Sequence, residues 1–126
     1  MRRSASLTRK APLRRTRRRL TTARREQATR FHRSIHGKRC VSCGAPATEA
    51  HHAIEAQYLR RHYPLHVYDT RNAVPVCGRC HANHTAATRR LPRACLPVEA
   101  ETFAAALGLT HLLERYYRPS AYREAA

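Results

Sequence analysis

The chain has 126 residues, and 25 Lys or Arg residues against 8 Asp or Glu residues give it a formal net charge of +17 at pH 7. A chain of this length is too short to secure itself through core burial alone, so we expect one small domain with an additional source of stability. It contains no apolar run long enough to cross a bilayer, so we expect no membrane-spanning segment. The positive charge favours a phosphate polymer as the partner.

Residues 1–33 form a strongly basic segment. They carry thirteen Lys or Arg residues and one acid, Glu26, and they offer almost no core-forming residue before Phe31. We therefore expect a disordered arm that binds DNA by counterion release, with an affinity that falls steeply with salt and little sequence preference. Arginine-rich N-termini also occur in organelle transit peptides and nuclear signals, and both readings stay open. The arginines of the arm that we expect on DNA are Arg14, Arg15, Arg17, Arg18 and Arg19.

The five cysteines include two Cys-x-x-Cys pairs. Cys40 and Cys43 form the first pair, and Cys77 and Cys80 form the second, with 33 residues between them. This spacing predicts four thiolates around one structural zinc ion. Disulfides or redox thiols fit less well, because the chain has neither a secretory signal nor the flanking pattern of a thioredoxin-like motif. Cys95 lies outside the spacing, and we expect it to be a small buried hydrophobe.

A short β-ribbon is predicted between the two cysteine pairs. Residues 45–54 and 72–76 are short and rich in Ala, Val, Ile and Thr, and Pro46 and Pro75 interrupt them. These features favour a small hairpin or ribbon.

The segment between the two strands, residues 55–63, predicts a short helix that ends at Pro64. Its Arg60 and Arg61 either contact DNA phosphates or belong to a solvated helix face, and we favour the solvated face. In that case the inward face consists of Tyr58, Leu59 and Tyr63.

Three further helices are predicted towards the C-terminus. Residues 78–90 lack proline and end in two arginines before Pro92, and residues 97–107 begin with proline and stop at Gly108. Thr110 opens the last helix, whose apolar stripe should dock on the core. The stripe consists of Leu109, Leu112, Leu113, Tyr116 and Tyr117.

Three histidines, His51, His52 and His81, lie close in sequence to the cysteines although a four-cysteine zinc shell does not need them. They are free to form a second site. Adjacent residues of an extended strand point to opposite faces, so His51 and His52 can serve one centre only if the strand bends or ends there. We interpret the other scattered histidines as surface or core residues, namely His32, His36, His62, His66 and His111.

The order of these residues resembles the HNH nucleases, or ββα-metal family, and in particular their phage-encoded zinc-containing branch. The resemblance covers roughly residues 38–88 and is carried by residues 39–44 (RCVSCG), 49–54 (EAHHAI) and 71–84 (RNAVPVCGRCHANH). It implies an α+β fold, a small treble-clef-like ββα-metal domain over residues 34–118 that includes the C-terminal helices. The basic arm, residues 1–33, precedes this domain and a tail, residues 119–126, follows it.

The resemblance also implies a role for each motif residue. His51 and His81 bind a catalytic metal, and His52 is the general base. Asn72 orients that base, because its side-chain amide or its backbone carbonyl accepts the second ring N–H. Many family members carry an acid where this chain has His51, so the identity of the catalytic metal stays open. The candidates are magnesium, manganese, nickel and zinc. A third histidine ligand usually falls where this chain has Thr85. His84, one residue earlier, is therefore either a metal ligand or a solvent-exposed helix residue.

The implied activity is hydrolysis of DNA phosphodiester bonds to 5′-phosphate and 3′-hydroxyl ends, with the metal stabilising the charge on the departing oxygen. A phage protein of this branch would act in the host cytoplasm, and the resemblance suggests the phage terminase as a second partner beside DNA. The alternative is a non-catalytic zinc module that binds DNA or RNA. Cleavage of supercoiled plasmid distinguishes the two hypotheses.

Overall fold

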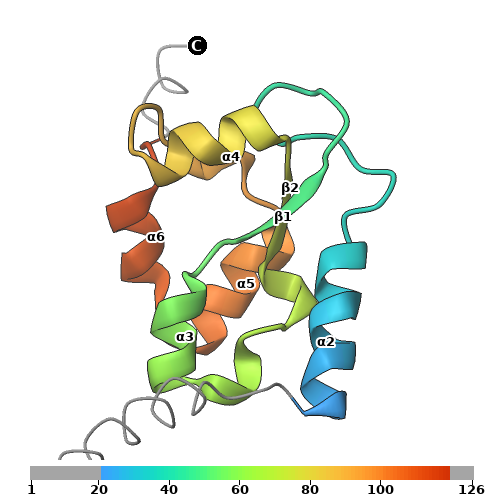
Figure 1. Ribbon diagram of the computed structural model, residues 1–126. Coiled ribbons are helices and arrows are strands. Elements are labelled where there is room, and N and C mark those ends of the chain that lie inside the picture. Colours follow the sequence, from blue (N-terminus) through green and yellow to red (C-terminus); the bar gives the residue numbers. More distant parts are fainter. Residues whose placement is uncertain (1–20, 120–126) are drawn as a thin grey trace, which may run out of the picture.

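The computed structural model describes residues 21–119, which form an α+β unit with five helices and a two-stranded antiparallel sheet (Figure 1). None of these helices has both the length and the apolar character that crossing a bilayer requires. The elements in chain order are α2 (Thr22–Arg33), β1 (Glu49–His52), α3 (Ala56–His62), the 3-10 turns η1 (Pro64–His66) and η2 (Thr70–Asn72), β2 (Ala73–Val76), α4 (Gly78–Thr85), the 3-10 turn η3 (Arg93–Cys95), α5 (Val98–Ala106) and α6 (Thr110–Tyr116).

The predicted ribbon is confirmed. β1 pairs with β2 so that His51 faces Val74 across the ladder and His52 faces Ala73. Val74 and Val76 are fully buried, and the main core forms between this ribbon, α3, α5 and α6. The helices predicted at residues 55–63 and 97–107 and the helix opened by Thr110 are present, because their apolar residues recur at helical spacing and meet this core.

The apolar stripe of the last helix docks as predicted. Leu112 and Leu113 of α6 are buried, as are Leu109 before it and Tyr117 after it, whereas Tyr116 is half-buried. Helix α6 packs against α5, and in the view of Figure 1 it stands at the left edge, with α4 above it and α3 below it.

The disordered arm predicted for residues 1–33 extends too far, because residues 22–33 form α2. The Oγ1 atom of Thr21 caps this helix by accepting from the Arg24 amide at 3.2 Å. Phe31 is fully buried and, with Ile35 and Ala50, makes a second small core between α2 and β1. Phe31 is therefore the buried residue through which α2, an otherwise polar and exposed helix, packs on the rest of the domain. Residues 1–20, including the five arginines predicted on DNA, lie outside the described part of the chain.

The helix predicted at residues 78–90 ends earlier than expected. Helix α4 stops at Thr85, and Ala87 has a left-handed φ of 60° that turns the chain away from the helix axis. The turn brings the buried Leu91 back against α4, where its amide donates to His84. Cys95 is only half-buried in η3, so the prediction of a buried hydrophobe was wrong at this position. In the predicted tail, Pro119 is exposed, and residues 120–126 lie outside the described range.

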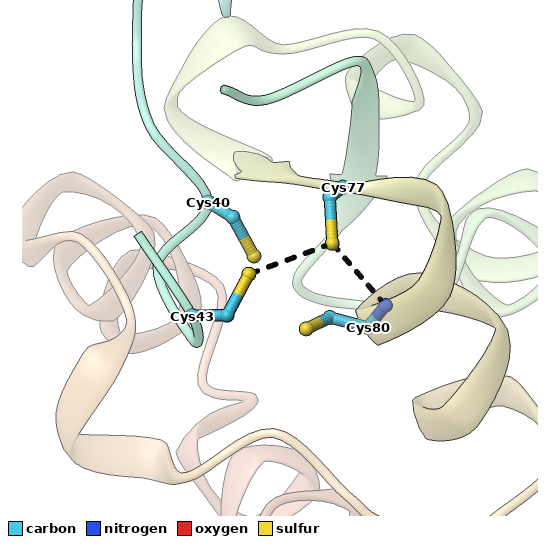
Figure 2. A group of neighbouring side chains, drawn as sticks. All are labelled: Cys40, Cys43, Cys77 and Cys80. Atoms are coloured by element: carbon cyan, nitrogen blue, oxygen red, sulfur yellow. Dashed lines mark hydrogen bonds between the residues drawn. The ribbon is translucent and has the colours of Figure 1, made fainter. Parts of the chain in front are cut away.

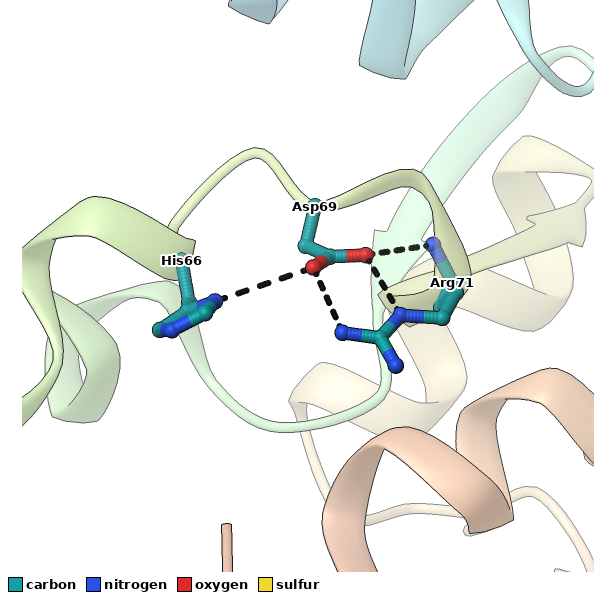
Figure 3. Close-up of polar contacts among 3 residues, drawn as sticks. All are labelled: His66, Asp69 and Arg71. Atoms are coloured by element: carbon teal, nitrogen blue, oxygen red, sulfur yellow. Dashed lines mark hydrogen bonds and ion pairs between the residues drawn. The ribbon is translucent and has the colours of Figure 1, made fainter. Parts of the chain in front are cut away.

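A charged turn leads into β2 (Figure 3). Asp69 caps η2 by accepting from the Arg71 amide at 3.0 Å, and the same carboxylate accepts from Nε of Arg71 at 3.1 Å and from Nη2 at 3.0 Å. Partial burial raises the pKa of Asp69, but the Arg71 hydrogen bonds outweigh it and lower the pKa. The ionised Asp69 thereby shapes the turn that delivers Asn72 to the start of β2.

Candidate metal centre and histidine cleft

The four cysteines of the two Cys-x-x-Cys pairs converge (Figure 2). They bring one sulfur each to within 4.8 Å of one another, and the Sγ atoms of Cys43 and Cys77 are 3.7 Å apart. A tetrahedral zinc ion, with bonds of about 2.3 Å to sulfur, places its ligands about 3.8 Å apart. The cluster can therefore hold a structural metal ion such as zinc, as the spacing predicted. Within residues 21–119, no other group of three or more histidine, cysteine or acidic side chains is gathered this closely.

Local turns aim these sulfurs. The Cys40 amide donates to Ala45 at 2.7 Å, and Gly44 donates back to Cys40 at 3.0 Å with a left-handed φ of 80° that favours glycine. The second pair opens α4, where Cys77 is the N-cap and its sulfur accepts from the Cys80 amide at 3.5 Å. Each pair is thus a tight turn whose geometry depends on two intervening residues.

The electrostatics of the quartet also favour a cation. Burial and the neighbouring Cys77 sulfur raise the pKa of the Cys80 thiol to about 12. Burial also raises the pKa of Cys40, but backbone amides of Cys43 and Cys77 outweigh it and lower the pKa to about 6. Four thiolates at this separation repel one another, so they ionise together only when a positive ion lies among them.

Four histidines line a single cleft with a volume of about 350 Å³, and none of the four cysteines lines it. The His51 ring centre lies 5.0 Å from that of His81 and 4.8 Å from that of His84. His52 lines the same cleft but packs against α2. The remaining side chains that line it include Glu55, Gln57, Thr85, Arg90, Tyr116 and Tyr117.

His51 is almost buried, with 9 % of its surface exposed, and its Nε2 atom lies 2.8 Å from the hydroxyl oxygen of Tyr117. The same hydroxyl donates to the Ala53 carbonyl at 2.7 Å. Burial, with smaller contributions from His84 and His81, lowers the pKa of His51 well below its ordinary value. His51 is therefore a neutral imidazole at neutral pH.

His81 projects from α4 towards β1. Its Nδ1 atom lies 2.6 Å from a carboxylate oxygen of Glu49. Glu49 has no role among the sequence-based predictions. The alternation of β1 could have indicated one, because residues two apart on a strand share a face and His51 lies two positions after Glu49.

His84, on the next turn of α4, is buried with 5 % of its surface exposed. This burial excludes one of the two alternatives predicted for His84, namely that it is a solvent-exposed helix residue. Its Nδ1 atom accepts from the Leu91 amide at 2.9 Å, and its ring stacks on that of Tyr117 with centres 4.8 Å apart. Burial, followed by the charge of Arg90, lowers the pKa of His84 to about 4.

His52 stacks on Phe31 of α2, with ring centres 4.2 Å apart. Its Nε2 atom is buried and has no hydrogen-bond partner. Burial lowers the pKa of His52 to about 4, against the opposite effect of a hydrogen bond to the Val67 backbone. The Val67 backbone is therefore a polar group beside this imidazole that favours its protonated form. The sequence could not indicate Val67, since a backbone group in a loop has no residue signature.

The predicted contact between Asn72 and His52 is not formed. The Asn72 side chain is completely buried, and Ile54 occupies both ends of its amide. The Asn72 Oδ1 atom accepts from the Ile54 amide at 2.8 Å, and its Nδ2 atom donates to the Ile54 carbonyl at 3.0 Å. Residue 54 lies beyond the last paired residue of β1. The Asn72 side chain therefore pairs with the backbone N–H and C=O of Ile54, which the sheet leaves without partners.

Arg60 and Arg61 are exposed on α3, whereas Leu59 is buried and Tyr58 and Tyr63 are half-buried. This arrangement agrees with the solvated face that we favoured, and neither arginine lines the histidine cleft. A contact between these arginines and DNA stays a prediction.

No protein-family model, curated protein or solved structure matches this chain. The cysteine quartet and the histidine cleft are therefore the features of the chain that indicate its function.

Proposed function

We propose that this protein is a metal-dependent HNH-type endonuclease that hydrolyses DNA phosphodiester bonds and holds zinc in its cysteine quartet. The observation that carries the proposal is the gathering of four imidazoles around one cleft beside a metal-capable cysteine cluster. The quartet joins the loop before β1 to the start of α4, and the four histidines lie on β1 and α4, so the part that the metal stabilises also positions the histidines.

His51 and His81 are suitable ligands for the second, catalytic metal. Two imidazoles bound to one tetrahedral zinc have ring centres about 5 Å apart, and the centres of these two rings are separated by 5.0 Å. Glu49 accepts from His81 in the manner of the carboxylates that support metal-bound histidines. The ligands are nitrogen atoms, which manganese, nickel and zinc prefer more strongly than magnesium does. When bound, the metal stabilises the charge that develops on the departing oxygen.

His52 is the proposed general base. Its Nε2 atom has no hydrogen-bond partner, so when the ring proton is on Nδ1 the lone pair of Nε2 is free to accept a proton from water. Because Nε2 is buried beside Phe31, water has to reach it from the histidine cleft that His52 also lines.

A non-catalytic zinc protein that binds nucleic acid is the second candidate. It is favoured by the burial of the His52 Nε2 atom, which keeps the proposed base from solvent. In this case the exposed arginines of α2 bind phosphate, and the histidines only complete the packing.

The test incubates zinc-loaded protein with supercoiled plasmid and magnesium, manganese, nickel or zinc. We expect conversion to open circles that DNA ligase reseals, because ligase requires 5′-phosphate and 3′-hydroxyl ends. His52→Ala should slow the conversion about 10²–10⁴-fold, which is the usual contribution of general base catalysis.

The matched control is His111→Ala, which removes an exposed histidine of α6 that does not line the cleft and should leave the rate unchanged. Binding of plasmid without cleavage in any of the four metals would support the non-catalytic protein instead.

A further inference from the structure

The hydrogen bonds of the cleft determine which ring nitrogen of each histidine carries the proton. A neutral imidazole has one N–H and one lone pair, and only the lone pair can bind a metal. The hydrogen-bond partners of His51, His81 and His84 therefore show which rings have a free lone pair that can bind a metal and which have a free N–H that can donate a hydrogen bond.

For His51 the partner is Tyr117, whose hydroxyl has one proton. That proton goes to the Ala53 carbonyl, because a carbonyl can only accept. The Tyr117 oxygen must then accept from the Nε2–H of His51. Tyr117 is thus a positioning residue that leaves the Nδ1 lone pair of His51 free.

For His81 the partner is a carboxylate, which also only accepts. The Nδ1 atom of His81 therefore donates to Glu49, and its free lone pair is on Nε2. His51 and His81 each retain a lone pair with which to bind a metal.

His84 has the opposite arrangement. Its Nδ1 atom accepts from a backbone amide, that of Leu91, so the lone pair of Nδ1 is occupied and the proton of the neutral ring is on Nε2. An N–H group cannot bind a metal, but it can donate to an anion. Arg90, which lines the same cleft and donates to the His84 carbonyl at 3.0 Å, places a positive charge beside it.

We infer that His84 is a hydrogen-bond donor to a phosphate oxygen of the bound nucleic acid, and that His51 and His81 are the two protein ligands of the second metal. This inference deepens the proposed nuclease function and rests on it. Within residues 21–119, no three ligand atoms that include a histidine lie close enough together to form a closed metal site. Water and phosphate complete the metal shell.

The direct test is long-range ¹H–¹⁵N NMR of the histidine rings in the wild-type protein with zinc in the cysteine quartet. We expect Nε2–H on His51 and His84 and Nδ1–H on His81. Further zinc should then shift His51 Nδ1 and His81 Nε2, and His84 should keep its Nε2 proton. Loss of that proton on zinc addition would overturn the inference.

A variant supplies the second measurement. In His84→Asn the amide oxygen takes the position of Nδ1 and can still accept from Leu91, but the donor at Nε2 is lost. We expect manganese affinity by calorimetry to stay within about twofold, and the cleavage rate to fall about 10²-fold, as when one transition-state donor is removed. The control, His62→Asn, alters an exposed histidine of α3 outside the cleft and should change neither quantity.

The outcomes separate the inference from the proposed function. A tenfold loss of manganese affinity in His84→Asn would make His84 a ligand, and an unchanged cleavage rate would remove its role as donor. If the wild-type protein binds no manganese beyond its zinc, or if His51→Ala binds as much as the wild type, the proposed catalytic metal site itself fails.

Discussion

Removal of the metal from the cysteine quartet is expected to unfold the domain. Structural zinc supplies about 10–16 kcal/mol in small zinc-binding folds, which is as large as the whole stability of about 5–15 kcal/mol that is common for small proteins. Here the quartet joins the loop before β1 to the start of α4, and the loop has a further link in the hydrogen bond from Val41 to Pro75 at 3.0 Å. Without the ion, repulsion among the clustered sulfurs also prevents all four thiols from ionising together.

The measurement is circular dichroism during thermal unfolding, with and without a zinc chelator, and the zinc content is determined in parallel. Cys77→Ser should abolish cooperative unfolding and lower the zinc stoichiometry. Cys95→Ser is the matched control, because Cys95 lies outside the quartet, and it should retain both. A chelated protein that keeps the same melting transition would show that the quartet is dispensable for folding.

Asn72→Ala is expected to lower the free energy of unfolding by about 2–6 kcal/mol, because it leaves two buried backbone groups without a partner and each costs about 1–3 kcal/mol. The substitution removes both hydrogen bonds from the buried backbone of Ile54. It also frees the loop that follows β1, whose Ala53 carbonyl holds Tyr117. Urea unfolding of the zinc-loaded protein measures the loss.

The control for this substitution is Asn83→Ala, which changes a half-buried residue of α4 and should cost little. The result also distinguishes the two roles considered for Asn72. If the side chain acted on His52, which is one form of the role that the resemblance implies, Asn72→Ala would impair cleavage but leave the stability close to that of the wild type.

The sequence alone determined the features that depend on local spacing. Two residues between cysteines are enough to form a turn that aims two sulfurs, so the quartet could be read from the chain. The ribbon and the helices α3, α5 and α6 were similarly predictable, because alternation and helical periodicity are properties of contiguous residues. The grouping of His51 with His81 also followed from motif order, although the reason for their convergence did not.

The tertiary structure decided the features that depend on contacts between distant residues. Helix α2 was hidden within a charge run, because its stability comes from Phe31 packing on His52 and Ala50. The end of α4 was set by the contact between His84 and Leu91.

The partners of the proposed catalytic residues were equally beyond the reach of sequence patterns. Tyr117 meets His51 across 66 positions of the chain, and Asn72 meets Ile54 across 18. Such pairs are chosen by the need to satisfy buried polar groups once the core has formed. That need arises only in three dimensions, so the proton positions of the cleft, and with them the proposed roles of its histidines, could be assigned only from the folded structure.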